Sequence, residues 1–146
     1  MHINSMTKSV VSIMATGATN GETLTANIDT LGFDSAAIDL IMGTSNTTSN
    51  KPSVLKLGES DDTVVSNFAD ITAFTGGSGF TIVTSSTSVE NVYRFNVDCR
   101  NRKRYLRITV SPRTTQAVVL NARLGRAEQS GDGSTSYSGT QQVVSG

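Results

Sequence analysis

Three carboxylates near the middle of the chain are the first residues whose type and spacing could support chemistry. Glu59, Asp61 and Asp62 lie within four positions, and clustered carboxylates suit hard cations such as Ca²⁺ and Mg²⁺. Their spacing matches no calcium-loop template, so a solvated turn is the simpler interpretation. Any two acids could also meet in the fold as a glycosidase pair, but the chain has no Trp to stack on a sugar.

The cysteine, histidine and glycine residues offer equally little for catalysis or for ligand binding. One Cys and one His exclude an internal disulfide and a zinc site built from these ligands. Arg100 could lower the pKa of the neighbouring Cys99 thiol, although a strand-end Cys without a chemical role is the simpler interpretation. Residues 76–79 (GGSG) lack the Lys-Ser/Thr pair of a phosphate loop and are expected to be a flexible connection. We therefore expect no catalytic residue, no metal site and no cofactor.

The charged residues are divided unevenly along the sequence. Twelve basic and twelve acidic side chains give a net charge of zero, but residues 1–93 carry −6 and residues 94–146 carry +6. The basic residues of the second part are Arg94, Arg100, Arg102, Lys103, Arg104, Arg107, Arg113, Arg123 and Arg126. They could complement the acidic surface of a copy or a partner lattice, pair with acids of the same chain, or bind nucleic acid. The balanced total charge and the lack of a stacking motif disfavour nucleic acid.

Short strands are the elements that must position these residues. Ser and Thr make up 39 of the 146 residues, and Thr and Val suit strands whereas Ser, Gly and Asn suit turns. Alternating apolar residues predict strands over residues 8–16, 22–30, 35–43, 53–60, 80–84, 90–98, 103–111 and 116–124. A turn or short helix is expected over residues 61–66, and a weak strand over residues 67–72.

Two of these patterns also predict how strands are placed. Residues 35–43 are apolar on both faces except at Asp39, which indicates a central strand. In residues 90–98, Tyr93, Phe95 and Val97 face one way. The last three strands are expected to form an antiparallel meander.

The whole pattern predicts an all-β fold, a jelly-roll-like β-sandwich or barrel with flexible N- and C-terminal arms. The expected organisation is an N-terminal arm over residues 1–7, the β domain over residues 8–126, and a C-terminal tail over residues 127–146, where Ser, Gly, Gln and Thr dominate. No run approaches 18 apolar residues and no secretory signal is visible, so we expect no membrane partner. An apolar fraction of 36% indicates a modest core, to which oligomerisation could add burial.

Three segments recur in the same order in small structural proteins of tailed phages. They are Asn27 to Ala36 (NIDTLGFDSA), Leu55 to Asp62 (LKLGESDD) and Asn96 to Leu106 (NVDCRNRKRYL). Over residues 24–128 the chain resembles the capsid cement, or decoration, proteins of marine and environmental phages. It departs from the family pattern at Gly58, where Gln is usual, and at Asn101, where Gly is usual. Asn is the best substitute for Gly in a left-handed turn.

The resemblance implies a jelly-roll-like domain on the outer surface of an icosahedral phage head. It implies binding to the major capsid protein and bridging of neighbouring capsomers by a homo-oligomer, expected to be a trimer, without catalysis. The expected contact residues are Arg100, Arg102, Lys103 and Arg104, with Glu59, Asp61 and Asp62 as complements. The alternative is a glycan- or receptor-binding β-sandwich module of a tail or head fibre, which the low aromatic content disfavours.

Overall fold

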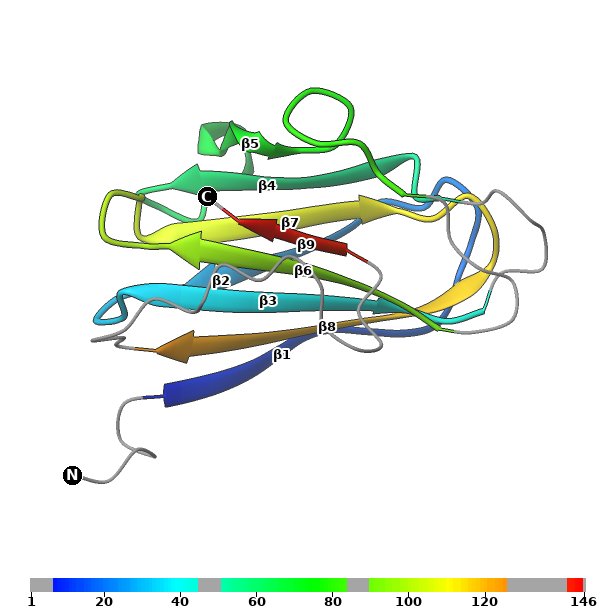
Figure 1. Ribbon diagram of the computed structural model, residues 1–146, viewed down its shortest axis with the longest axis horizontal. Helices are drawn as coiled ribbons and strands as arrows, with labels where there is room; N and C mark the ends of the chain where they lie inside the picture. The colour runs from blue at the N-terminus through cyan, green and yellow to red at the C-terminus, as the bar shows by residue number, and fades with distance from the viewer. Residues whose placement is uncertain (1–6, 45–50, 84–89, 126–141, 146) are drawn as a thin grey trace.

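The computed structural model describes residues 7–44, 51–83, 90–125 and 142–145, which form two β-sheets packed face to face (Figure 1). The elements are β1 (Thr7–Ala18), β2 (Leu24–Asp29), β3 (Ser35–Met42), β4 (Val54–Ser60), the 3-10 helix η2 (Val65–Asn67), β5 (Ala69–Thr75), β6 (Asn91–Asp98), β7 (Tyr105–Ser111), β8 (Gln116–Gly125) and β9 (Gln142–Ser145). The predicted all-β sandwich is confirmed. Within the described part of the chain, no helix is long and apolar enough to cross a membrane.

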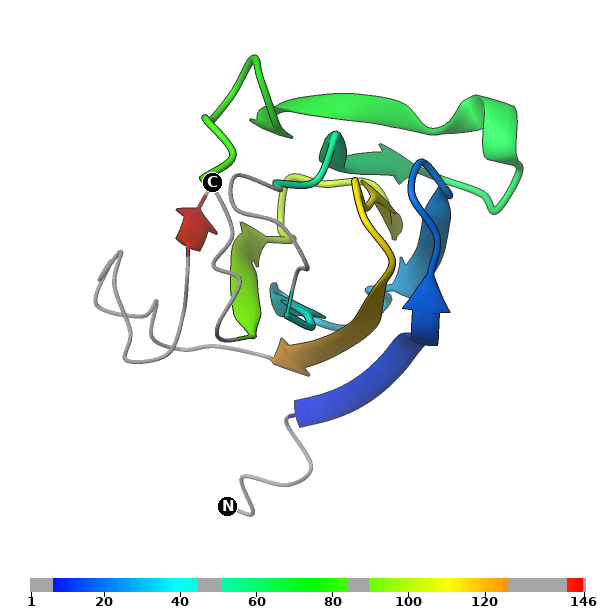
Figure 2. The same ribbon diagram turned by 90° about the vertical axis from the view of Figure 1, so that its right-hand side faces the viewer.

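The strand order is that of a jelly roll. One sheet runs β1-β8-β3-β6-β9 and the other runs β2-β7-β4-β5. From β1 to β8, each strand of the first half pairs with one of the second half: β1 with β8, β2 with β7, β3 with β6 and β4 with β5. The end view shows how these pairs wrap around one core (Figure 2). The acidic and basic parts of the sequence are therefore interleaved in both sheets.

The expected meander of the last three strands is wrong. β6 and β8 lie in one sheet on either side of β3, whereas β7 lies in the other sheet between β2 and β4. The turns over residues 99–104 and 112–115 carry the chain from one sheet to the other. Alternation along a strand fixes which face is buried, but it does not say in which sheet the strand pairs.

Side-chain alternation in the strands builds the core between the sheets. In β3 the buried residues are Ala36, Ile38, Leu40 and Met42, and β6 points Tyr93, Phe95 and Val97 to the same side, as predicted. The ring of Phe95 meets those of Phe74 and Phe80 edge to face, with centroids 6.0 and 5.9 Å apart. β3 is the middle strand of its five-stranded sheet, as its apolar character on both faces predicted.

Residues 76–83 differ from expectation in two ways. Residues 81–83 form no strand, and Phe80 makes only an isolated bridge with Gly76. The glycine-rich segment is a close-packed turn and not a loose connection, because a Cβ on Gly79 would lie 2.0 Å from the carbonyl oxygen of Thr72. Only glycine allows the backbone to approach its neighbour this closely.

The end of the chain also differs from the predicted tail. Gln142–Ser145 form β9, which pairs in parallel with β6 and covers an edge that β6 would otherwise expose. Val144 is buried there, which gives the strand an apolar anchor in a polar stretch of sequence. Residues 1–6 and 126–141, on which the predicted flexible arms fall, lie outside the described residues.

The two faces of β3 generate a stability prediction. Ile38 is fully buried in the core, whereas Ile41 is half-buried on the outer face of the same strand. Ile38→Ala should lower the free energy of unfolding by about 2–5 kcal/mol because it leaves a cavity. Ile41→Ala, the matched control, should cost roughly 1 kcal/mol or less. Denaturant titration measures both, and equal losses would contradict the assigned core.

Candidate functional site

Three loops from distant parts of the sequence meet at one end of the sandwich (Figure 1, left). They are the β2–β3 corner (residues 30–34), the β4–β5 connection (residues 61–68) and the β6–β7 turn (residues 99–104). Together with the strand-end residues Asp29, Glu59, Ser60 and Asp98, we call this region the charged end. Charged side chains gather here from three loops that would be unrelated in an extended chain.

Backbone hydrogen bonds fix the corner against the turn. The N–H of Thr30 donates to the carbonyl oxygen of Arg104 at 3.0 Å, and the N–H of Cys99 donates to that of Asp34 at 2.8 Å. The corner itself closes through a bond from the Phe33 N–H to the Thr30 carbonyl oxygen. Gly32 has φ = +83°, a left-handed conformation that glycine adopts without strain.

Asp29 and Arg104 form the ion pair that links β2 to the start of β7. The Nε and Nη2 atoms of Arg104 donate to the two carboxylate oxygens of Asp29 at 2.9 and 2.8 Å. Asp29 also accepts a hydrogen bond from the backbone N–H of Leu31, which fixes the start of the corner. The guanidinium hydrogen bonds lower the pKa of Asp29 from its usual 3.8 to about 2, with the Leu31 N–H adding to the effect.

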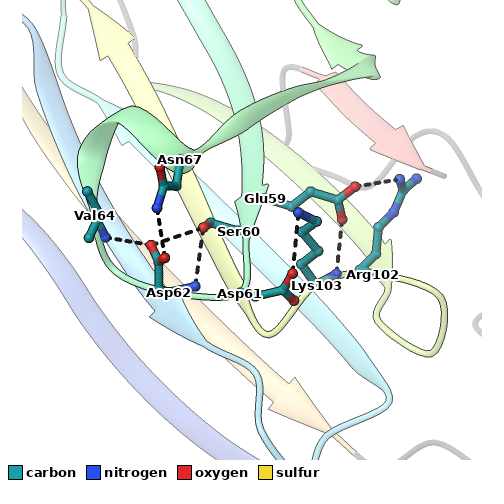
Figure 3. A network of polar contacts seen from close by, with 8 residues as sticks. All are labelled: Glu59, Ser60, Asp61, Asp62, Val64, Asn67, Arg102 and Lys103. Atoms are coloured by element: carbon teal, nitrogen blue, oxygen red, sulfur yellow. Dashed lines mark hydrogen bonds and ion pairs between the residues drawn. The ribbon is translucent and has the colours of Figure 1, made fainter.

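A second cluster joins the end of β4 to the β6–β7 turn (Figure 3). Glu59 accepts the backbone N–H of Lys103 at 3.1 Å and lies 3.7 Å from Nη1 of Arg102. The Nζ of Lys103 lies 3.3 Å from a carboxylate oxygen of Asp61. The predicted acidic and basic residues are thus brought together, but as partners within one chain.

Asp62 has a different role from the other predicted acids. Its Oδ1 accepts the N–H of Val64 at 2.9 Å, and its Oδ2 accepts an amide N–H of Asn67 at 2.8 Å (Figure 3). The N–H of Asp62 donates in turn to Oγ of Ser60. The hydrogen bonds from Asn67 and Val64 lower the pKa of Asp62. Asp62 therefore organises the β4–β5 connection and contacts none of the basic side chains predicted beside it.

Arg100 completes the pairing of the basic turn. Its Nε donates to Oδ1 of Asp98 at 2.9 Å, and its backbone N–H donates to the same oxygen. These hydrogen bonds lower the pKa of Asp98 to about 2.

An open depression with a volume of about 490 Å³ lies between the corner and the turn, and it is lined in part by Arg100, Arg102 and Arg104. Each of these arginines already contacts a carboxylate, so the depression presents no unpaired guanidinium to an anion.

The alternative of a cation site at Glu59, Asp61 and Asp62 is not supported. The three carboxylates point to different partners, namely the turn backbone, Lys103 and the β4–β5 connection. Among the described residues, no group of three or more His, Cys, Asp or Glu side chains is placed to hold a metal ion.

The alternative of an activated Cys99 thiol is wrong. Burial, together with the nearby carboxylates of Asp98 and Asp34, raises the pKa of Cys99 to about 11, and the lowering effect of Arg102 is smaller. Cys99 is 8% exposed, and its Sγ lies near the Val97 carbonyl oxygen. The thiol contributes to packing beneath the turn.

Several residues of the charged end were not predicted from the sequence. Asp29 emerges only through the pairing of β2 with β7, which no local pattern specifies. Leu31, Val64 and Val65 stand exposed, and the available signal for the two valines is their position in residues 61–66, which are predicted as a turn or short helix. Gly58 faces β5, and a Cβ there would lie 3.1 Å from the Ala69 carbonyl oxygen, so the two strands pack closely at this position.

Comparison with models of protein families, with curated proteins and with solved structures gives no match in any of the three.

The Asp29–Arg104 pair generates a pH prediction. Because the pKa of Asp29 is lowered on folding, the pair stabilises the protein fully above about pH 4 and loses its effect as the pH falls toward 2. Asp29→Asn keeps an oxygen to accept the Leu31 N–H but removes the charge. The variant should melt a few degrees lower than wild type at pH 6, since the pair is exposed. The difference should shrink steadily as the pH falls through about 2, and a constant difference would contradict the assignment.

Cys99 generates a reactivity prediction. A buried thiol with a pKa of about 11 should react with a thiol-specific reagent at pH 7.5 at least tenfold more slowly than the same thiol in the denatured protein. The measurement is the rate of chromophore release with and without denaturant. Equal rates would show that Cys99 is accessible in the native protein.

Proposed function

We propose that this chain is a structural protein of a phage virion, which binds the outside of an icosahedral head and bridges neighbouring capsomers. Its partners in the proposal are the major capsid protein and further copies of itself, as a homo-oligomer expected to be a trimer. It performs no catalysis in this role. The charged end is the surface that the proposal assigns to the shell.

One observation carries the proposal. The three segments that resemble phage cement proteins, residues 27–36, 55–62 and 96–106, are far apart in the sequence, yet each supplies a loop or strand end of the charged end. Their contacts with one another include the Asp29–Arg104 pair and the Glu59 contacts with the β6–β7 turn. Segments that serve a common binding task are expected to build one surface, and the meeting of these three segments at the charged end supports the proposal.

The physical character of the region supports a binding role. Ion pairs and backbone hydrogen bonds hold the loops in one arrangement, so little conformational entropy is lost when a partner binds. On a symmetric shell, an oligomer repeats such a contact at each copy, and modest affinity per copy becomes firm attachment.

The test is co-sedimentation of the purified protein with phage heads stripped of it. Wild type should bind saturably at a fixed stoichiometry. Its native mass by light scattering should be near three times 15.4 kDa. Arg104→Glu places a negative charge beside Asp29 at the charged end and should reduce binding at least tenfold.

The matched control is Lys56→Glu, which breaks an ion pair with Asp70 between the neighbouring strands β4 and β5, outside the three loops. It removes a cation in the same way and should leave head binding within about twofold of wild type. Melting curves identify any variant that fails to fold. Wild type that does not sediment with heads would overturn the proposal and make the glycan- or receptor-binding module the working alternative.

A further inference from the structure

The strand β9 is attached to the sandwich by a short contact. Its four residues pair with β6 alone and in parallel, whereas the other described strand pairs are antiparallel. Parallel pairing is slightly less stable per residue, and four residues are fewer than a typical strand has. Val144, which lies opposite Phe95, adds one buried apolar side chain. Separating β9 from β6 therefore costs little compared with separating a longer strand.

The surface that receives β9 is made of backbone groups. β9 is the outermost strand of its sheet, and β6 meets it along residues Tyr93 to Asn96 (Figure 2). An edge strand without a neighbour presents a row of unpaired N–H and C=O groups, which another strand can complete. Every copy of the chain carries the same edge and the same β9. The β9 of one copy therefore fits the β6 of another copy through the contacts that it makes in its own chain.

The connection to β9 is longer than pairing within one chain requires. Sixteen residues join Gly125, at the end of β8, to Gln142 at the start of β9. The strand order and registers set these two residues three strands apart across the sheet and five residues apart along it. Ordinary strand spacings make this separation roughly 20–25 Å. An extended connection of this length reaches about 55 Å, so the β6 edge of a neighbouring copy is within its reach.

Exchange of β9 between copies keeps each local contact and changes what the contact joins. When a neighbour's β6 edge is held at a similar distance, it is as available to β9 as the edge of its own chain. In a closed ring, each copy gives one β9 and receives one, so no β6 edge is left uncovered. Each exchanged strand then ties two copies together without any additional binding surface.

We propose that β9 is an exchange strand, which in the homo-oligomer pairs with the β6 of the next copy. The interaction surface is the β6 edge, and the partner is a second copy of this chain. Val144 fixes the register, because its side chain enters the core beside Phe95. This inference rests on the homo-oligomer of the function proposed above and names the contact that joins its copies.

The test joins β9 to β6 by a disulfide. Asn96 and Ser145 are direct partners in the register, so Asn96→Cys/Ser145→Cys, in a Cys99→Ala background, places two thiols within bridging distance. After oxidation, exchange predicts covalent multimers on a non-reducing denaturing gel, with three chains in the expected trimer. The matched control is Ala37→Cys/Asn96→Cys in the same background, because β3 and β6 pair there within one chain. The control should run as a single chain.

Val144→Asp provides an independent measurement. A carboxylate at this buried position would lose its hydration, so β9 should leave β6. Exchange predicts that the native mass by light scattering falls from that of the oligomer to 15.4 kDa, the mass of one chain. The matched control is Met14→Asp, at an exposed position on β1 at the opposite edge of the same sheet, which should keep the wild-type mass. Melting curves show whether both variants fold.

The gel is run on the free protein and on protein bound to stripped heads, and each outcome decides the matter. Covalent multimers in either state, with single chains from the control, support exchange. Single chains in both states would overturn exchange, and the proposed function then stands if the protein sediments with heads. Multimers of a protein that does not bind heads would keep exchange and remove the role at the shell. If the cysteines fail to oxidise or the control also forms multimers, an unchanged mass of Val144→Asp would overturn exchange.

Discussion

The backbone passes from one sheet to the other after β1, β2, β3, β5, β6 and β7, and the opposed apolar faces of the two sheets oblige it to do so. The strands between the crossings are fixed by their buried side chains. The β2–β3 and β6–β7 crossings fall at the same end, where Thr30 bonds to the Arg104 carbonyl oxygen and Cys99 to that of Asp34. The Asp29–Arg104 pair and the position of the β6–β7 turn depend on this joining of crossings.

The interleaving of strands also brings the acidic first part of the sequence beside the basic second part. Asp39 of β3 lies directly opposite Arg94 of β6 and bonds to it through both carboxylate oxygens, and Asp29 of β2 reaches Arg104 beside β7. An acidic first part and a basic second part thus become neighbouring strands of one molecule. These acids and bases pair within one chain. The loops that the ion pairs brace form a stiff surface.

The alternation of apolar residues was sufficient to predict the buried faces of β3 and β6, because a half-buried strand must repeat every second residue. It predicted only a weak strand over residues 67–72, where the structure has β5 over Ala69–Thr75 with a register shift in its pairing with β4, and it missed β9, which is too short for a period to show. The turn residues Arg100 to Arg104 were identified from composition, yet their partners were not. Asp29 and Arg104 are 75 positions apart, and only the pairing of β2 with β7 brings them together.

Exposed apolar residues are the part of the site that sequence reasoning is least able to find. Val64 and Val65 have side chains typical of strands and cores, yet both stand exposed in the β4–β5 connection, where the N–H of Val64 donates to Asp62.

Hydrogen exchange of the protein free and bound to stripped heads tests the central claim most directly, because it locates the contact without altering the chain. Binding at the charged end predicts slower exchange of amides in residues 30–34, 61–68 and 99–104, with the loops of the opposite end unchanged. Protection confined to residues 19–23 and 112–115 at the opposite end, or to the outer face of the β1-β8-β3-β6-β9 sheet, would contradict the account.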